Sequence, residues 1–176
     1  MTLFARIFAY LASGRPMAHQ APPVAPGAVA STGDGATAPP LPAHPYPSPP
    51  EPLPMALTAR DRERLRGVHP DLVRVVERAR RETAIMVIEG LRTPERQRQL
   101  VAHGASKTLR SRHLTGHAVD LGPVPLDWND WPAFRAMAGA VLRAADEEGV
   151  AVEWGGNWPT FRDGPHFELR REKYPA

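Results

Sequence analysis

The sequence predicts an α+β domain that follows a long proline-rich linker. Segments with the spacing of amphipathic helices are separated by short apolar runs, without the regular strand–helix–strand repeat of an α/β fold. Of the 21 prolines, 13 lie within residues 16–54, among Ala, Gly, Ser and Thr that offer little large apolar surface to bury. We therefore expect a short apolar segment over residues 1–14, a disordered Pro/Ala-rich linker over residues 15–55 and one folded domain over residues 56–176.

The first 14 residues allow two interpretations. Residues 3–12 are apolar apart from Arg6, but this run is far shorter than the roughly 20 residues that span a bilayer. A signal peptide has its positive charge before the apolar run, whereas Arg6 lies inside it. A weak export signal or anchor therefore competes with a plain start of the linker, and we expect no stable membrane span.

Two helices open the folded domain. Thr58 followed by "ARDRERLRG" has the pattern of a capped helix that ends at Gly67. The segment "HPDLVRVVERARRE" places Pro70 in the first turn of a second helix, where proline is well accommodated. The apolar side chains at helical spacing, which we expect to face the core, are Leu72, Val73, Val76 and Ala79.

A strand, a third helix and a loop follow. The segment "TAIMVIEG" is β-branched and apolar over residues 84–88, which predicts a buried strand. The segment "TPERQRQLVAHG" predicts a helix with Thr93 as its cap, Pro94 in its first turn and Gly104 at its end. Residues 107–112 are polar and are expected to form a loop.

The sequence of the last part of the domain predicts three strands and one long helix. "HAVDLG" indicates a short strand that ends at Gly122. "DWNDWPAFRAMAGAVLRAADEEG" predicts a long helix with Pro132 near its start and Gly149 at its end. "VAVEW" predicts a strand before a turn at Gly155 and Gly156, and "HFELR" predicts the strand that closes the sheet.

Charge and cysteine content restrict the partners and the metals. The formal net charge is +3 and the sequence pI is about 9.8, which favours polyanions such as nucleic acid or an anionic cell wall. No basic tract interleaved with aromatic residues and no zinc-finger spacing is present, so we expect no nucleic-acid partner. The chain has no cysteine, so any metal must be held by nitrogen and oxygen atoms.

The seven histidines supply the candidate nitrogen ligands. His19 and His44 fall in the linker. His69 falls at a helix start and His103 at a helix end, where an imidazole can cap the helix. The histidines that remain are His113, His117 and His166.

The segment "SRHLTGHAVDL" supports two arrangements. His113 and His117 are four residues apart, the spacing of two ligands on one helix face, but Gly116 inside such a helix would cost about 1 kcal/mol relative to alanine. If the segment is instead a loop that runs into a strand, Ala118 and Asp120 share one face and His117 lies on the other. Asp120 can then point at a metal together with His113, and mixed His and Asp ligation suits Zn²⁺.

The segment "DGPHFEL" offers a third ligand and a catalytic group. His166 would complete the ligand set, and Asp163 precedes it by three residues across a Gly–Pro turn. A carboxylate in this place can take a proton from an attacking water and later protonate the leaving amine. The alternatives are an ordinary turn role for Asp163 and a hydrogen-bonded core position for His166.

Four segments in the order "EGLRTPERQ", "SRHLTGHAVDL", "EWGGNW" and "DGPHFEL" closely resemble phage-type L-alanyl-D-glutamate endopeptidases, which act as endolysins. These enzymes belong to the wider zinc D,D-peptidase and D-Ala-D-Ala dipeptidase group, which shares its fold with the hedgehog signalling domain. The resemblance covers residues 57–169 and none of the linker. The family pattern Ser-x-His-x-x-Gly-x-Ala-x-Asp is filled at every specified position, by Ser111, His113, Gly116, Ala118 and Asp120.

The resemblance implies a small, mostly antiparallel sheet packed by helices and one Zn²⁺ per domain. The implied zinc ligands are His113, Asp120 and His166, whereas His117 falls at an open position of the pattern. Asp163 would be the catalytic carboxylate. Arg92 would polarise the scissile carbonyl and stabilise the oxyanion, although an arginine at a helix start can also be merely solvated. The residues that we expect to line the cleft or to support the ligands are Ser111, His117, Trp154 and Trp158; the alternative is a plain surface position for His117 and a core position for the two tryptophans.

The implied function is that of a monomeric zinc endopeptidase that cuts the stem peptide of peptidoglycan, at the L-Ala–D-Glu bond. Such an enzyme is made in the host cytoplasm and acts on the cell wall in the periplasm, with bacterial lysis as the result. The alternatives are a D,D-carboxypeptidase or D-Ala-D-Ala dipeptidase of the same fold, and a non-catalytic module that binds zinc or the cell wall. The presence of both Asp163 and Arg92 favours an enzyme.

Overall fold

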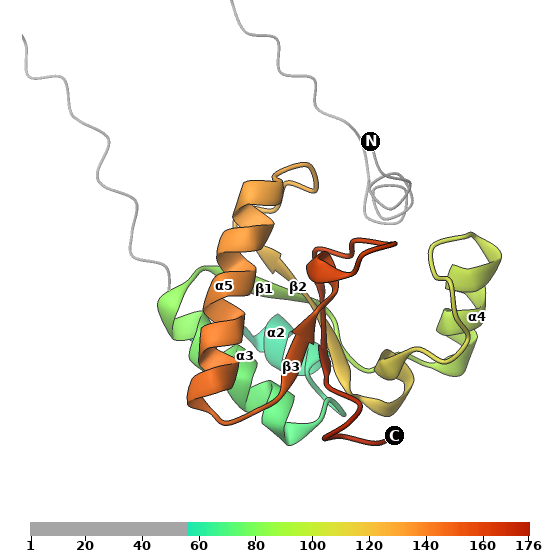
Figure 1. The fold of residues 1–176 in the computed structure, drawn as a ribbon, viewed down its shortest axis with the longest axis horizontal. Helices are drawn as coiled ribbons and strands as arrows, with labels where there is room; N and C mark the ends of the chain where they lie inside the picture. Colours follow the sequence, from blue (N-terminus) through green and yellow to red (C-terminus); the bar gives the residue numbers. More distant parts are fainter. Residues whose placement is uncertain (1–55) are drawn as a thin grey trace, which may run out of the picture.

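The computed structural model describes residues 56–176, so the predicted apolar segment and linker lie outside the described residues. The described part is an α+β domain, as the sequence predicts (Figure 1). Its helices are α2 (Ala59–Arg64), α3 (Pro70–Glu82), α4 (Pro94–Ala102) and α5 (Trp131–Glu147), with 3-10 turns η1 (Arg112–Thr115) and η2 (Gly155–Asn157). Its strands are β1 (Ile85–Glu89), β2 (Ala118–Pro123), β3 (Val152–Trp154) and β4 (His166–Leu169).

The four strands form one antiparallel sheet in the order β1-β2-β4-β3. Strand β4, which we expected to close the sheet, lies in its interior, and β3 forms an edge. The reason is that β4 uses both of its sides: His166 is paired with Asp120 of β2, while Phe167 is paired with Trp154 of β3. The strand nearest the C-terminus therefore joins the two halves of the sheet.

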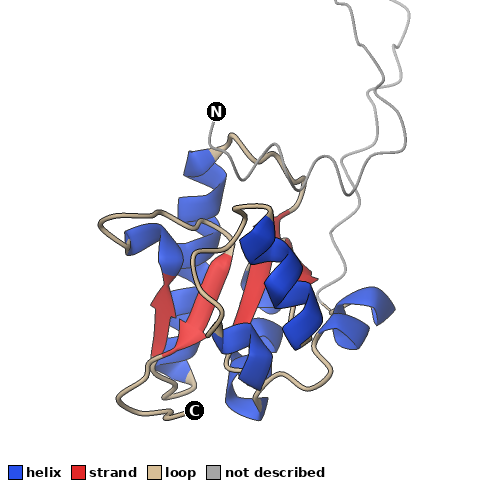
Figure 2. Cartoon of the chain, turned by 90° about the vertical axis from the view of Figure 1, so that its right-hand side faces the viewer, coloured by secondary structure: helices blue, strands red, loops and turns tan. Residues whose placement is uncertain are grey.

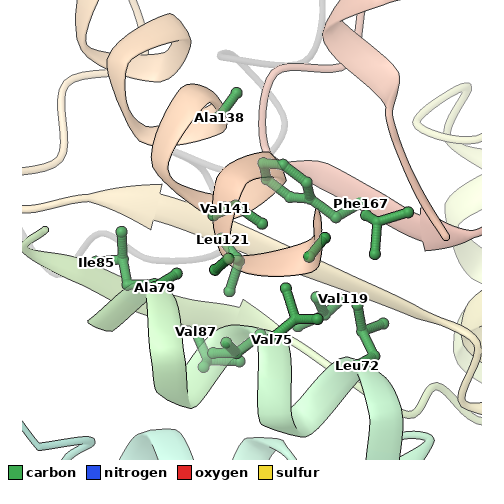
Figure 3. Close-up of a cluster of buried hydrophobic side chains, with 14 of the residues drawn as sticks. Leu72, Val75, Ala79, Ile85, Val87, Val119, Leu121, Ala138, Val141 and Phe167 are labelled. Carbon is green, nitrogen blue, oxygen red and sulfur yellow. The ribbon is translucent and has the colours of Figure 1, made fainter. Parts of the chain in front are cut away.

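The hydrophobic core lies between the sheet and helices α3 and α5, which lie side by side in Figure 1. Figure 3 shows Val119 and Leu121 of β2 and Phe167 of β4 among side chains of both helices. The α3 residues that are fully buried are Leu72, Val75, Val76 and Ala79. Val73, which we expected in the core, is only partly buried, because the stripe at i, i+3, i+4 and i+7 from Leu72 includes Val75 instead.

Helix α2 is fixed to β1 by its capping residues. Thr58 and Asp61 form a reciprocal capping box, as expected of Thr58, although the helix ends at Arg64 rather than at Gly67. The Asp61 carboxylate also accepts a hydrogen bond of 2.9 Å from the backbone N–H of Val87 in β1. Burial would raise the pKa of Asp61, but the hydrogen bonds from Thr58 and Val87 hold it below its usual value.

The remaining helices begin and end as their sequences indicate. Helices α3, α4 and α5 each have proline in the first turn, and the Thr93 side chain caps α4 by accepting from Arg96 N–H at 3.1 Å. His69 is the N-cap of α3 and His103 the C-cap of α4, so both have the capping roles that we expected.

Helix α4 stands apart from α3 and α5, and Figure 2 shows the domain from this side, with the strands flanked by helices. Within residues 56–176, no helix has both the length and the apolar character that crossing a membrane requires. The face of the sheet that α3 and α5 leave free carries the polar residues described next.

Candidate metal centre

Three predicted ligand side chains converge on one point. His113 Nε2 lies 3.2 Å from Asp120 Oδ1 and 3.3 Å from His166 Nδ1, and His166 Nδ1 lies 3.2 Å from Asp120 Oδ1. Among the described residues these three form a group that could hold a metal ion. His113 is 1% exposed, His166 7% and Asp120 9%, so the donor atoms form the floor of a cleft rather than a surface cluster.

Strand register explains how residues distant in sequence meet. Asp120 of β2 is directly paired with His166 of β4 and, across the other edge of β2, with Glu89 of β1. Because alternate residues of a strand share a face, all three side chains lie on the face opposite the core residues Val119 and Phe167. The sheet therefore presents a row of ionisable groups on its free face.

The turn η1 brings His113 to this row. The segment is not a helix with two ligands on one face: it is a single 3-10 turn that ends at Gly116, whose φ is +72°, and then enters β2. A Cβ at Gly116 would lie 2.1 Å from the carbonyl oxygen of Gly67, so no other residue fits. Gly116 O also accepts from His69 N–H at 2.8 Å, which fixes the turn against the start of α3.

Each histidine has its second ring nitrogen engaged by an acceptor. His113 Nδ1 lies 2.7 Å from the backbone oxygen of Gly90, and His166 Nε2 lies 3.1 Å from Glu168 Oε2. If these nitrogens carry the proton, then His113 Nε2 and His166 Nδ1 present lone pairs to the shared point. Acceptors of this kind commonly orient metal-binding histidines.

The donor set fits a tetrahedrally coordinated ion. Zn²⁺ bonds of about 2.0–2.2 Å to nitrogen and oxygen give tetrahedron edges of roughly 3.3–3.5 Å, close to the observed 3.2–3.3 Å. Without a metal, hydrogen bonds from the histidines to Asp120 hold these atoms together, and a divalent ion would replace the protons of those bonds. These residues therefore suit a divalent metal ion that prefers oxygen and nitrogen ligands.

The electrostatics of the three groups also favour a cation. Burial would raise the pKa of Asp120, but the His113 charge and hydrogen bonds to both histidines hold it well below its usual range. Burial opposes a charge on His166, yet its hydrogen bonds to Asp120 and Glu168 raise its pKa to about 10. The same carboxylates that retain a proton at His166 would retain a metal ion.

Asp163 lines the same cleft as the three ligand residues. It is placed by the η2 turn, since Asp163 N–H donates to Gly155 O at 3.0 Å. A Cβ at Gly155 would lie 2.8 Å from Asp163 O and 3.1 Å from the Cβ atoms of Asp163 and His166, which explains why the turn has glycine here. Burial and the neighbouring charge of Asp120 raise the pKa of Asp163 to about 6.

Arg92 reaches the centre from the other side. Its Nη2 donates to Glu89 Oε2 at 2.5 Å and lies 3.5 Å from Asp120 Oδ2, and its Nη1 donates to Gln97 Oε1 at 2.8 Å. The guanidinium is buried, and its Nε has no hydrogen-bond partner among the described residues. Arg92 is therefore held in the cleft wall and is not a solvated helix-start arginine.

The cleft has a volume of about 370 Å³ and contains two of the four supporting residues that we expected. Ser111 lines it and accepts from the backbone N–H of His113 at 3.4 Å, so it acts on the backbone rather than on the ring. Trp158 lines it with its ring 5.1 Å from that of His166.

Two predicted cleft residues lie elsewhere. His117 is outside the cleft, with Nδ1 2.8 Å from Thr115 O and its ring 5.3 Å from that of His69, because the strand alternation turns it away from Asp120. Trp154 is a core residue, 7% exposed, whose indole N–H donates to Gly164 O at 2.7 Å.

Two further polar residues were not singled out from the sequence. Glu168 binds His166, and its position two residues further along a strand is a signal that could have placed it on the same face. Gln97 contacts Arg92 from α4, but α4 is short and its sequence does not mark this glutamine as buried. Both lie inside segments that carry the resemblance, Gln97 at the end of "EGLRTPERQ" and Glu168 within "DGPHFEL".

Comparison with known proteins agrees with the geometry. A family model described as "Phage L-alanyl-D-glutamate peptidase" matches residues 53–171. A relative from Listeria phage A118 named "L-alanyl-D-glutamate peptidase" is 37% identical over 90 residues, 51% of this chain and 32% of the relative. A relative of the same name from Escherichia phage T5 is 32% identical over 120 residues, 64% of this chain and 87% of the relative.

A solved structure is similar over about two thirds of this chain. The "Crystal structure of Serratia marcescens L-Ala D-Glu endopeptidase ChiX" matches with a TM-score of 0.64 and 54% identity, covering 69% of this chain and 94% of that chain. The match spans about a third of the Listeria phage relative but most of the Escherichia phage T5 relative and of the Serratia protein. The family match over residues 53–171 covers most of the chain, which therefore belongs to the phage L-alanyl-D-glutamate peptidase family.

Proposed function

We propose that this chain is a zinc-dependent endopeptidase that hydrolyses the stem peptide of peptidoglycan at the L-Ala–D-Glu bond. The observation that carries the proposal is the triangle of donor atoms from His113, Asp120 and His166, with edges of 3.2–3.3 Å, in one cleft with Asp163 and Arg92. The names of the family and of its relatives support the substrate class.

The roles of the residues follow from their charges. A Zn²⁺ ion bound by the three ligands supplies a Lewis acid and lowers the pKa of water towards 7. Asp163 accepts the proton of the water that attacks the scissile carbonyl, and it returns that proton to the departing nitrogen as the C–N bond breaks. Arg92 places a fixed positive charge beside the oxyanion, where removing one such donor typically costs about 100-fold or more in rate.

The test is digestion of purified peptidoglycan with the full chain, with and without a chelator, read by mass spectrometry. We expect fragments with a free N-terminal D-Glu, no release after chelation, recovery on adding Zn²⁺, and no release by His113→Ala. Fragments that lack only the terminal D-Ala would instead indicate a D,D-carboxypeptidase, and hydrolysis of free D-Ala-D-Ala without cleavage of the stem peptide would indicate a dipeptidase. Zinc-independent release, or wall binding without any cleavage by the zinc-loaded protein, would contradict the proposal.

The cellular context is part of the same proposal. We infer that the protein is made in the host cytoplasm and acts on the cell wall in the periplasm. We also infer that it works as a monomer, since the three ligands, Asp163 and Arg92 line one cleft of a single chain. The net charge of +3 would aid approach to an anionic wall. Stronger wall binding at high salt than at low salt would contradict this role of charge, and light scattering of the purified protein tests the monomer.

The region before the catalytic domain of residues 56–176 is proposed to be a tether. Residues 15–55 would act as a spacer and residues 1–14 as a short apolar lead, by their composition. Removing residues 1–55 is expected to leave cleavage of a soluble muropeptide unchanged. An equal loss on soluble and wall-bound substrate would contradict the tether role.

A further inference from the structure

Gln97 is a fully buried amide whose oxygen and both N–H groups have hydrogen-bond partners. It is 1% exposed. Its Oε1 accepts from Arg92 Nη1 at 2.8 Å, and its Nε2 donates to Ser106 Oγ at 2.8 Å and to Thr108 O at 2.7 Å. An amide has two N–H donors, and both are engaged, so this side chain has one fixed orientation.

These contacts connect two separate walls of the cleft. On one side is Arg92, whose guanidinium lies against Glu89 and Asp120. On the other is the segment after α4, defined here as the 105–110 loop, which contributes five of its six residues to the cleft. Gln97 is therefore the residue through which the loop and the arginine are held at a fixed distance from each other.

After the first two residues of the 105–110 loop, Gln97 provides the hydrogen bond that holds the loop to the domain. Ala105 and Ser106 are fixed to α4 by backbone bonds to Leu100 O. The other hydrogen bonds of Thr108 join it only to Ser106 and Arg110, within the loop itself. Among the hydrogen bonds of residues 56–176, the bond from Gln97 is thus the one that connects Thr108 to the rest of the domain.

We propose that Gln97 is a positioning residue for the proposed hydrolysis: one buried amide sets both the orientation of Arg92 toward the scissile carbonyl and the position of the substrate-facing 105–110 loop. The proposal rests on the proposed function. The carboxamide oxygen of Gln97 orients Arg92, which stabilises the transition state. The amide nitrogen of Gln97 holds Thr108 and so the loop that binds the substrate. The two halves of the same group therefore affect kcat and KM separately.

Two substitutions separate the halves. Gln97→Glu keeps an acceptor for Arg92 but has no donor for Ser106 or Thr108 and places a carboxylate against the Thr108 carbonyl. Gln97→Leu removes both functions. We expect Gln97→Glu to raise KM for a soluble muropeptide while kcat stays within about threefold, and Gln97→Leu to lower kcat by about 10- to 100-fold as well.

The matched control is Gln99→Leu, an exposed position on the same helix. Hydrogen exchange of the zinc-loaded proteins gives a readout that does not need catalysis: amides of the 105–110 loop should exchange faster in both Gln97 variants and unchanged in Gln99→Leu. Zinc affinity, measured by calorimetry, should be the same in all four proteins.

The outcomes distinguish this proposal from the proposed function. If the wild-type chain cleaves no stem peptide, the function fails, while the exchange data still test whether Gln97 holds the loop. Unchanged loop exchange in Gln97→Leu would overturn the positioning role whatever the activity. A kcat for Gln97→Leu equal to that of Gln99→Leu, or a loss that matches a loss of zinc affinity, would overturn it too.

Discussion

At the scale of single residues, the metal centre depends on which ring nitrogen of each histidine faces inward. His113 is oriented by the backbone oxygen of Gly90 and His166 by the carboxylate of Glu168. The first acceptor cannot be changed by substitution, whereas the second is a side chain with a further ion pair of 3.3 Å to Arg171. Glu168 is therefore the supporting residue whose role can be measured.

Replacing Glu168 should weaken metal binding. Glu168→Ala leaves His166 Nε2 without its acceptor, so the ring loses both its orientation and part of its basicity. We expect zinc affinity to fall by about 10- to 100-fold, measured by calorimetric titration of the metal-free protein. Glu172→Ala, an exposed acid close in sequence, is the control, and equal affinities for the two variants would refute the role of Glu168.

The protonation of Asp163 should set the acid side of the pH–rate profile. The pKa of Asp163 is raised to about 6, and a general base works only when deprotonated, so kcat/KM should be high above this pH and fall below it. The charge of a bound metal ion shifts the limb toward lower pH. Asp163→Asn is expected to lose about 100- to 10,000-fold in rate.

The variant His117→Ala tests whether a group other than Asp163 causes the acid limb of the pH–rate profile. His117 is the imidazole nearest in sequence to His113, but it lies outside the cleft. The variant His117→Ala should therefore retain the same acid limb as the wild type. If the acid limb of the pH–rate profile disappeared in the His117→Ala variant, the titrating group would be His117 and not Asp163.

At the scale of elements, the η2 turn determines where the catalytic segment lies. Gly155 contacts the backbone of Asp163, and it directly follows the last residue of β3. This contact leaves no room for a side chain at Gly155, so this position of the "EWGGNW" segment acts through its backbone, whereas Trp158 at the end of the segment lines the cleft. This is a packing explanation for a motif that the sequence presents only as a turn.

Adding one methyl group at Gly155 should lower activity. In Gly155→Ala the Cβ would lie 2.8 Å from Asp163 O, so the 163–166 segment must move. We expect kcat to fall by about 10- to 100-fold and the free energy of unfolding to fall by about 1–3 kcal/mol. Steady-state kinetics with a soluble muropeptide and urea denaturation measure the two effects.

The control is the same substitution in a helix with room for it. A Cβ at Gly139 of α5 meets only Arg143 Nη1, at 3.5 Å. Gly139→Ala should therefore leave kcat unchanged and raise the free energy of unfolding by about 0.5–1 kcal/mol. If both alanine variants had wild-type kcat, the steric role of Gly155 would be wrong.

At the scale of the whole molecule, the metal and the fold should be thermodynamically coupled. The ligands come from η1, β2 and β4, so an ion at the centre binds the folded state and not the unfolded chain. At a free Zn²⁺ concentration of 100 times Kd, the gain is about 2.7 kcal/mol, which corresponds to a rise in Tm of roughly 5–15 °C. Differential scanning calorimetry should show this rise for the wild type and none for His113→Ala, and an equal rise in both would refute a site at these residues.

Local sequence signals predicted most elements, and pairing between distant segments accounts for what they missed. Thr58 and Thr93 marked helix starts because capping is a local interaction. The residues alone left the 113–117 segment open between helix and strand, and only the resemblance assigned the ligands. The interior place of β4 depends on pairing with strands far along the chain, and the burial of Gln97 depends on the loop that folds back onto α4, which the pattern of the helix itself does not record.

The central position of β4 has a consequence for how copies of this protein arise. A ribosome must translate the chain through Leu169 before β2 and β3 acquire the strand that joins them, and that strand also carries His166. A nascent or prematurely terminated chain that stops before this strand has neither the third ligand nor a continuous sheet. Unfinished copies thus lack the complete centre, which appears only in chains whose synthesis has passed this strand.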